Sequence, residues 1–383
     1  MNVLHVTRNI PVKNLEGNDI ILKLLSNLKS RNLNQEIIFP SEYIPRLPFL
    51  PKRYRLFSEL SGKEVVRGFN LEFYRFLRLP YKFPYALSML GFERFLKRSK
   101  ISLPDVVHAH YIVPDGLIAL KLKKMKNIPY VITARQGDMD RINTIKNKPK
   151  ELAVFRRVLN EAGAIITPNI NLSKEIADVF NVKVETIPHG FDAEYSTDKN
   201  YKVDSSDIVK FVTCGQFIKR KNIDWVLDML ISLNRDGIVA ELNVIGDGPL
   251  FEEFHRKYGH SQQIKFLGWV SKEKVIKSMR ASDIFVLTSE RETFGMVYLE
   301  AAINECLVVG MKNTGVDGLF VNNESAIFVD DKEELKKIAE FLVKNKSFIR
   351  SVARKGKENV IDKCSWANVT EQYLRIYSDV VGK

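Results

Sequence analysis

Short apolar runs alternate with amphipathic helical patterns along almost the whole chain, and this alternation restricts the fold more than any other feature. In the first half the apolar runs are residues 3–6, 35–39, 105–110, 129–134, 162–169 and 184–188. Runs of this length are typical of buried strands, and intervening segments such as 115–125 and 172–180 repeat apolar residues at helical spacing. Strands that alternate with helices predict a parallel sheet with helices on both faces.

The same alternation restarts after a polar segment, 193–207, that lacks apolar periodicity and is typical of a linker. Further strands are expected at 210–215, 240–246, 264–270, 283–288, 307–311 and 326–329, and helices at 223–234, 250–258, 272–280, 296–304 and from 332. The sequence therefore predicts two doubly wound, Rossmann-like α/β domains facing each other across a cleft, with ligands beyond the carboxyl ends of the strands. The expected divisions are a first domain at 1–195, a linker at 196–207, a second domain at 208–363 and a final helix at 364–383.

Composition excludes several other classes of protein. The 383 residues are 45% hydrophobic and 27% charged, which is typical of a soluble globular chain and not of a disordered one. No apolar run is long enough for a transmembrane helix, and no secretory signal is expected at the N-terminus. Three distant cysteines predict no disulfide framework and favour a reducing cytosol, and the six histidines show no zinc-binding spacing.

The excess of basic over acidic residues lies entirely in the first half of the chain. Residues 1–190 contain 31 Lys and Arg against 17 Asp and Glu, whereas residues 191–383 contain 28 against 29. Within the first half, residues 41–100 combine 13 basic residues with 13 aromatic ones, among them Phe69, Phe73, Tyr74, Phe76, Tyr81, Phe83 and Tyr85. Such a segment can bind an anionic membrane surface or nucleic acid, or it can be a solvated basic face over ordinary core aromatics.

The densest group of candidate site residues lies at 289–300, with the sequence SERETFGMVYLE. Glu292 and Glu300 are eight residues apart, and a helix is expected to begin between them, near Gly295. The free N–H groups at a helix N-terminus suit a diphosphate, and glycine lets the backbone approach it. Glu300, expected on the first helical turn, can accept hydrogen bonds from vicinal hydroxyls such as those of a ribose. Taken alone, two surface glutamates beside a helix N-terminus are common.

A basic run follows the first strand of the second half, where residues 214–222 read CGQFIKRKN. A cationic side chain there, from Lys219, Arg220 or Lys221, would neutralise a diphosphate and favour its departure as a leaving group. The structural alternative is a solvated charged face.

Together these residues resemble the family 4 glycosyltransferases (glycosyltransferase group 1) of GT-B architecture, of the type that assembles bacterial surface polysaccharides. The most specific element is E-x7-E, from Glu292 to Glu300, within S-x-x-E-x-F-G-M-V-x-x-E-A. Other matching elements are HAHYIVPDG, ITARQGD, IPHGFD, GQFIKRK, GDGP and FLGWV. Residues 366–377, WANVTEQYLRIY, look like the family's last helix, which crosses back onto the first domain. The resemblance covers nearly the whole chain.

The resemblance implies a role for each matching residue. Glu300 would bind the ribose of a nucleotide-sugar donor, Glu292 the donor sugar, and Lys221 the leaving diphosphate. The backbone amides expected at the pyrophosphate belong to Phe294, Gly295 and Met296. Thr314 and Gly315 lie where the family often has a glycine pair near the sugar and phosphates. The family retains the anomeric configuration and needs no metal, so neither a metal nor a cofactor is expected.

Three positions depart from the family's pattern. Gln216 stands where the family usually has an arginine, so Lys219 or Arg220 would have to supply the charge. Arg135 stands where members often have a histidine; it could contact a phosphate or a sugar hydroxyl but could not act as a neutral proton acceptor. The loop after the first strand has only one glycine, Gly17, which indicates a different approach for the acceptor.

Other candidates have a structural alternative. Asp138, on the acceptor side, begins a D-x-D pattern that holds a metal in other transferases, although no metal is expected here. His108 and His110 alternate at a strand end; His110 either faces the cleft as a catalytic residue, or one of the two is a core histidine. Cys214 is expected to be a small buried residue.

The sequence thus predicts a retaining, metal-independent glycosyltransferase of the hexosyltransferase type. Its donor would be a UDP- or GDP-sugar, and its acceptor a glycan or polyprenyl-linked molecule at the anionic inner face of the membrane. The chain would be cytoplasmic and peripherally bound there, with no nucleic-acid partner. The alternatives are a GT-B sugar-nucleotide epimerase, which converts the donor alone, and a non-catalytic glycan- or nucleic-acid-binding protein on the same fold.

Overall fold

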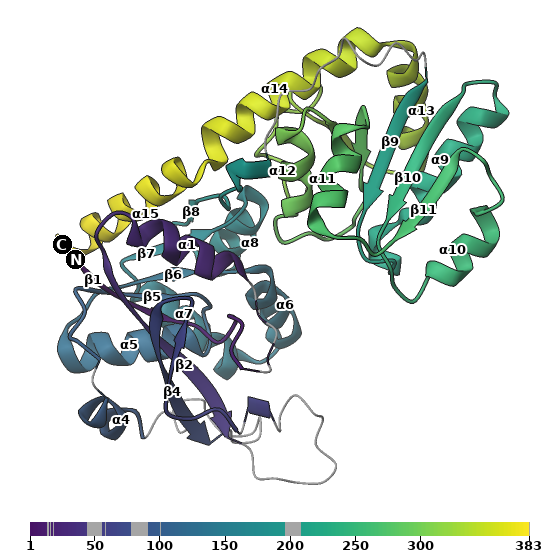
Figure 1. The fold of residues 1–383 in the computed structure, drawn as a ribbon. Coiled ribbons are helices and arrows are strands. Elements are labelled where there is room, and N and C mark those ends of the chain that lie inside the picture. The colour runs from purple at the N-terminus through teal and green to yellow at the C-terminus, as the bar shows by residue number, and fades with distance from the viewer. Residues whose placement is uncertain are drawn as a thin grey trace. The chain divides into compact units, whose positions relative to one another are not determined.

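The computed structural model describes residues 1–13, 15, 17, 19–43, 56–57, 59–77, 91–99, 101–195 and 208–382. Their contacts divide the chain into two compact units (Figure 1). Unit 1 comprises Met1–Pro168, Leu172–Ile187 and Thr370–Lys383, and unit 2 comprises Asn169–Asn171 and Pro188–Val369. The predicted linker, 196–207, lies outside the described residues, and the domain boundaries expected from the sequence stay predictions.

Unit 1 contains an eight-stranded sheet in the order β3-β4-β2-β1-β5-β6-β7-β8. Its strands are β1 (Asn2–Val6), β2 (Asn34–Tyr43), β3 (Lys63–Val66), β4 (Phe69–Leu77), β5 (Val106–Ala109), β6 (Tyr130–Thr133), β7 (Ala164–Thr167) and β8 (Glu185–Thr186). All pairs are parallel except β3 with β4. The order of the strands reverses between β1 and β5, because β1 has β2 on one side and β5 on the other.

Helices cover this sheet in unit 1. They are α1 (Asp19–Lys29), α4 (Phe92–Arg98), α5 (Asp115–Lys126), α6 (Gln136–Ile145), α7 (Pro149–Asn160) and α8 (Ile170–Phe180), the last of which begins in the short segment assigned to unit 2. The helix α5 packs on β1, β5 and β6, and α1 packs on β2. The apolar runs predicted as strands in this half all form strands, as the alternation predicts.

The basic and aromatic segment at residues 41–100 contains the strands β3 and β4, which belong to the sheet. The strands β3 and β4 form an antiparallel pair in the sheet, and the Phe69, Phe73, Tyr74 and Phe76 rings are buried in the core. These four rings are therefore unavailable to a membrane or a nucleic acid, and for them the ordinary core interpretation holds. Tyr81, Phe83 and Tyr85 lie outside the described residues.

Unit 2 contains a six-stranded parallel sheet in the order β11-β10-β9-β12-β13-β14. Its strands are β9 (Val209–Cys214), β10 (Ala240–Ile245), β11 (Ile264–Gly268), β12 (Ile284–Val286), β13 (Leu307–Met311) and β14 (Ile327–Val329). This is the strand order of a doubly wound sheet, which reverses between β9 and β12. The prediction of a doubly wound α/β fold is confirmed.

Two groups of helices pack on the sheet of unit 2 (Figure 1). The helices are α9 (Ile223–Arg235), α10 (Phe251–Tyr258), α11 (Lys272–Arg280), α12 (Met296–Ile303), α13 (Lys332–Lys344) and α14 (Lys346–Cys364). α9 and α13 contact each other, and so do α11 and α12, and α12 and α14. Short 3-10 turns lie at Ala193–Tyr195 and Lys219–Lys221.

The last helix, α15 (Trp366–Val381), contributes its second half to the core of unit 1. Tyr373, Tyr377 and Val380 on this helix are buried, and the Tyr377 hydroxyl lies 2.7 Å from Nδ1 of His108 in β5. Among the described residues, no helix is both long enough and apolar enough to cross a bilayer.

Candidate functional site

The two loops that follow β9 and β12 form the candidate site in unit 2. Ligands of doubly wound sheets bind beyond the carboxyl ends of the strands, where the strand order reverses. In unit 2 this point lies between β9 and β12, and β13 lies beside β12. The residues predicted to bind the donor all follow one of these three strands, so the fold brings together Gln216 and Gly315, which are 99 residues apart in the sequence.

Hydrogen bonds join the loop after β9 to the loop after β12. The Arg220 side chain donates from Nη1 to the carbonyl of Arg291 at 2.7 Å, and its own carbonyl accepts from the N–H of Glu290 at 2.9 Å. The Asn222 amide donates to the carbonyl of Thr288 at 3.1 Å, and the Thr288 hydroxyl donates back to the Asn222 carbonyl at 3.0 Å. Arg220, predicted as a donor-binding residue, therefore helps to hold the two loops together in this structure.

Two lysine–glutamate ion pairs lie at this edge of the sheet. Lys221 pairs with Glu292, and each side chain is 12% exposed; Lys272 pairs with Glu300, whose side chain is 14% exposed. The pKa of the Cys214 thiol at the end of β9 is raised to about 11, because burial and the Glu300 charge raise it more than Lys272 and Lys221 lower it. Lys221 from one pair, and Lys272 and Glu300 from the other, therefore act electrostatically on the same thiol at the end of β9.

Lys272 is a site residue that the sequence reasoning did not identify. It is the first residue of α11, in the segment after β11, and it reaches Glu300 in α12. The available signal was a lysine at the first helical position after FLGWVS, close to the expected donor site. The sequence also placed Glu300 on the first helical turn, but α12 begins at Met296, so Glu300 lies on the second turn.

Two glycines bring the backbone close to Glu292. Gly295, which precedes α12, has φ +77°, and a Cβ there would lie 2.5 Å from the Tyr298 ring. Gly315, after β13, has φ +44°, and a Cβ there would lie 2.9 Å from Cβ of Glu292. Side chains at either position would be strained and would displace these neighbours. The loop that carries Thr314 and Gly315 therefore packs directly against the Glu292 segment.

The remaining residues predicted at the donor site differ in their exposure. The Phe294 side chain is buried and meets the His189 ring edge to face at 4.9 Å, so it anchors the loop in the core. Met296 is half-buried at the start of α12, and the Thr314 hydroxyl donates to the Met311 carbonyl at 3.1 Å. Gln216 is exposed at the end of β9.

In unit 1 the corresponding reversal of strand order, between β1 and β5, lies beside Arg135. This arginine precedes α6 and is 5% exposed. Its Nε donates to the carbonyl of His110 at 3.3 Å, and its guanidinium lies 5.8 Å from the centre of the Tyr111 ring. Gly17, predicted on the acceptor side, is exposed and lies against the backbone of Ile10.

Asp138 has a structural role in α6. Its carboxylate accepts hydrogen bonds from the N–H groups of Arg135 and Ile112, both at 3.0 Å. Burial raises the pKa of Asp138 to about 7, while these hydrogen bonds and the Arg135 charge act in the opposite direction. Both oxygens of the first aspartate in the D-x-D pattern are therefore engaged by backbone amides that fix the start of the helix.

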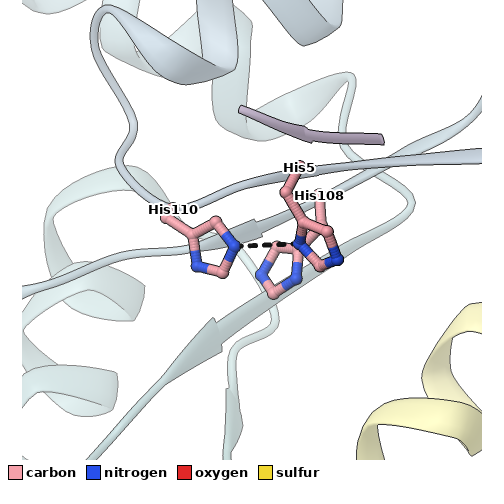
Figure 2. A group of neighbouring side chains, drawn as sticks. All are labelled: His5, His108 and His110. Atoms are coloured by element: carbon pink, nitrogen blue, oxygen red, sulfur yellow. Dashed lines mark hydrogen bonds between the residues drawn. The ribbon is translucent and has the colours of Figure 1, made fainter. Parts of the chain in front are cut away.

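Three buried histidines that are distant in the sequence meet in the core of unit 1 (Figure 2). His5 in β1 is the register partner of His108 in β5, and His110 follows two residues later. The Gln35 amide nitrogen donates to the carbonyl of Leu25 at 2.9 Å, so its oxygen accepts from Nε2 of His5 at 3.0 Å. Nδ1 of His5 then accepts from Nε2 of His110 at 3.1 Å.

The histidine cluster is a hydrogen-bonded core network in this structure. One nitrogen from each ring lies within 4.8 Å of the others, which is a spacing that a metal ion could use. However, the His108 and His110 rings are stacked with centroids 4.0 Å apart, so their in-plane lone pairs run side by side and do not converge on one ion. Both nitrogens of His108 also have hydroxyl partners, Tyr377 and Thr133, at 2.7 Å.

Burial determines the charge of this cluster. It lowers the pKa of His5 to about 3 and holds those of His108 and His110 well below the ordinary value, so all three rings are neutral near pH 7. His110 has no exposed surface in this structure, and the catalytic role expected for it stays a prediction. Its Nδ1 has no hydrogen-bond partner among the described residues.

Two family models match the chain. The model described as Glycosyltransferase Family 4 matches residues 30–195, and the model described as Glycosyl transferases group 1 matches residues 198–359. The N-acetyl-alpha-D-glucosaminyl L-malate synthase of Bacillus anthracis is 24% identical over 295 residues, which are 72% of this chain and 75% of that protein. The lipopolysaccharide core biosynthesis glycosyltransferase LpsE of Rhizobium meliloti is 24% identical over 293 residues, 74% of this chain and 82% of that protein.

Solved structures show the same fold across the whole chain. The sucrose-phosphate synthase of Thermosynechococcus elongatus superposes with a TM-score of 0.72 at 15% identity and covers 100% of this chain and 99% of its own. The Anabaena protein HepE, in complex with UDP, superposes with a TM-score of 0.70 at 15% identity. The match covers 99% of this chain and 100% of the HepE chain. Since two glycosyltransferase models together match residues 30–195 and 198–359, and the solved structures share the GT-B fold, the chain belongs to the family 4 glycosyltransferases, the glycosyltransferase group 1 proteins.

Proposed function

We propose that this glycosyltransferase transfers a sugar from a UDP- or GDP-sugar to a glycan or lipid-linked acceptor, with retention of the anomeric configuration and without a metal ion. The observation that supports this most directly is the arrangement of two lysine–glutamate pairs around the N-terminus of α12. Cations, carboxylates and free helix amides at one sheet edge are what a nucleotide diphosphate sugar requires, since it carries both charged phosphates and hydroxyls.

Each residue at this edge has a definite part in the proposed reaction. The Glu300 carboxylate accepts hydrogen bonds from the ribose hydroxyls, and the amides that begin α12 bind the diphosphate. Lys221 and Glu292 neutralise each other in the unliganded structure. When the donor enters, Lys221 turns its ammonium group to a phosphate oxygen, and Glu292 becomes free to accept a hydroxyl of the donor sugar. Lys221 and the helix dipole then stabilise the negative charge that develops on the leaving diphosphate.

The names of the similar proteins agree with this proposal. HepE has been solved with UDP and with UDP-glucose, which is the donor chemistry proposed here. LpsE is named for lipopolysaccharide core biosynthesis, which supports an acceptor used in cell-surface polysaccharide assembly. The names of two other similar proteins include L-malate and sucrose phosphate, both of which carry anionic groups.

Donor binding is tested first by thermal unfolding of the full chain with UDP, GDP and ADP and their common sugars, in the presence of a chelator. A nucleotide at about 100 times its Kd adds roughly 2.7 kcal/mol, which raises the midpoint by several degrees. A shift with one nucleotide that EDTA leaves unchanged is expected. No shift with any nucleotide would contradict the proposed donor site.

Transfer itself is tested by NMR of the reaction products. With an acceptor present, the anomeric signal of the new glycoside should have the configuration of the donor sugar; inversion would contradict the retaining mechanism. Incubation of the donor without an acceptor separates the proposed transferase from an epimerase, because only an epimerase converts the sugar in that sample.

The excess of positive charge in residues 1–190 supports a peripheral site of action at the cytoplasmic face of the membrane. Flotation with liposomes at low salt tests this part of the proposal separately. Binding to anionic vesicles, with little binding to neutral ones and loss at high salt, is expected. Equal binding to both vesicle types would refute the membrane assignment and leave the donor site unaffected.

A further inference from the structure

Arg135 is a nearly buried cation without an ion-pair partner. It is 5% exposed, and the hydrogen bond recorded for its guanidinium is the one from Nε to the His110 carbonyl at 3.3 Å. Among the described residues, no carboxylate oxygen comes within the 4.0 Å that defines an ion pair with this arginine. A buried arginine is ordinarily paired, because an uncompensated charge in the interior is costly. Its terminal nitrogens are therefore available to an anion from outside the chain.

Among the described residues, the acidic groups around Arg135 form no ion pair with its guanidinium. Asp138 uses both carboxylate oxygens to accept backbone N–H groups. Asp115 is fully buried, neither of its oxygens has a hydrogen-bond partner among the described residues, and burial holds its pKa well above the ordinary value. Arg8 lies in the same electrostatic environment but pairs with Glu42 at 2.6 Å.

The phenol and imidazole groups next to Arg135 are neutral near pH 7. Burial raises the pKa of Tyr111, and burial together with the Arg135 charge keeps the pKa values of His108 and His110 low. None of these three rings therefore supplies a negative charge to Arg135 near pH 7.

Arg135 also lies where a doubly wound sheet binds ligands. It follows β6, and the loops after β1 and β5 flank the point at which the strand order reverses. The helices α5 and α6 begin at this edge, with Asp115 and Arg135 at or next to their first residues. The positive ends of two helix dipoles and a guanidinium fork attract phosphate or carboxylate groups in particular.

We propose that Arg135 binds a phosphate or carboxylate group of the acceptor, so that this enzyme takes acceptors that carry such a group near the reacting hydroxyl. This inference rests on the proposed glycosyl transfer and names its acceptor class. The donor diphosphate has its own cation and helix N-terminus in unit 2, whereas Arg135 belongs to unit 1. A permanently charged arginine favours an anionic group over an uncharged hydroxyl at this edge of the sheet.

The test compares anion binding by the full chain and by Arg135→Gln, Arg135→Lys and, as a control, Arg157→Gln, an exposed arginine on α7. The probes are inorganic phosphate, L-malate and glucose 6-phosphate, with glucose as the uncharged reference, titrated at constant ionic strength. We expect Arg135→Gln to weaken binding of the anions about 10- to 100-fold, Arg135→Lys to fall between, and Arg157→Gln to behave as the unmodified chain.

UDP affinity is measured on the same samples, and it distinguishes a failure of the acceptor proposal from a failure of the proposed function. A circular dichroism spectrum and a thermal midpoint equal to those of the unmodified chain show that unit 1 of Arg135→Gln is folded, and unchanged UDP binding shows the same for unit 2. Anion affinity equal to that of the unmodified chain would then overturn the acceptor proposal alone, whereas loss of UDP binding by the unmodified chain would overturn the proposed function.

Vesicles of phosphatidylglycerol and of phosphatidylcholine distinguish the source of the anion. A defect of Arg135→Gln with the soluble anions indicates a water-soluble acceptor. A defect confined to the phosphatidylglycerol vesicles indicates a lipid-linked acceptor, and either result supports the proposal. No defect with either probe refutes it.

Discussion

The ribose assignment of Glu300 can be tested by a replacement that removes charge and preserves shape. In Glu300→Gln the side chain keeps its size, but one carboxylate oxygen becomes an amide nitrogen and the negative charge is lost. The variant should bind UDP more weakly, because one of the two acceptor oxygens becomes a donor nitrogen and the remaining oxygen carries no negative charge. The same variant should discriminate poorly between UDP and 2′-deoxy-UDP, which lacks one of those hydroxyls.

The expected magnitude follows from the surroundings of Glu300. Its side chain is 14% exposed, so a hydroxyl bound there is largely shielded from water. Hydrogen bonds to charged groups contribute about 1.5–3 kcal/mol, and we expect the lower part of this range because Lys272 already contacts one carboxylate oxygen. A loss of about 1.5–2 kcal/mol corresponds to a roughly 10- to 30-fold decrease in UDP affinity.

Isothermal titration with UDP and 2′-deoxy-UDP, in the presence of EDTA, measures both quantities. The matched control is Glu358→Gln, an exposed glutamate on α14, which should bind both nucleotides as the unmodified chain does. In the unmodified chain the ratio of the two affinities should be about 10 or more, and in Glu300→Gln within about 3-fold. Unchanged UDP affinity together with an unchanged ratio would mean that the ribose does not contact Glu300.

Three further predictions concern stability and loop geometry. Gly295→Ala should reduce UDP affinity at least about 10-fold, since φ +77° and the nearby Tyr298 ring force the start of α12 to move; titration calorimetry on a variant with unaltered circular dichroism checks this. Lys272→Met should lower the free energy of unfolding, measured by urea denaturation, by about 1 kcal/mol, and it should lower it by less when Glu300 is already replaced by Gln. Equal losses in the two backgrounds would show that Lys272 and Glu300 do not stabilise each other. The folded-state pKa of His5, about 3, lies below the unfolded value of 6.5, so its contribution is present above pH 6.5 and is lost as the pH falls towards 3. Between pH 6.5 and 5 the free energy of unfolding should fall by about 2 kcal/mol through His5, and His5→Gln should lack this part of the decrease. Identical pH profiles of the unmodified chain and His5→Gln in urea denaturation would contradict the prediction.

The second half of the chain was predicted closely because each element carries its own signal. The helix expected at 272–280 is α11 with the same limits, and the strand expected at 307–311 is β13. Apolar residues in these segments repeat at the period of the element that they form, and the elements bury one face each. The motif from Glu292 to Glu300 likewise indicated a helix that begins beside Gly295, which differs by one residue from the observed α12.

The pair of β3 and β4 was missed because another property dominated the same residues. Residues 63–77 lie in the segment that was interpreted through its high positive charge and aromatic content. In the structure β4 alternates between the core and its surroundings and buries Phe69 and Phe73. The charge of a segment indicates that part of it faces solvent or a partner. Whether its aromatic rings are buried depends on which strand the segment pairs with.

The sequence by itself determined which elements form, their order and the sheet edge that carries the donor residues, because local periodicity and short motifs encode them. Only the tertiary structure decided which side chains meet. Lys272 and Glu300 are 28 residues apart and His5 and His108 are 103 apart, and neither pair follows from any local spacing. Such contacts depend on strand register and on the packing of loops from several strands, which are collective properties of the folded chain. The same packing buries Arg135 without a carboxylate partner among the described residues, and this is the observation on which the proposed anion site rests.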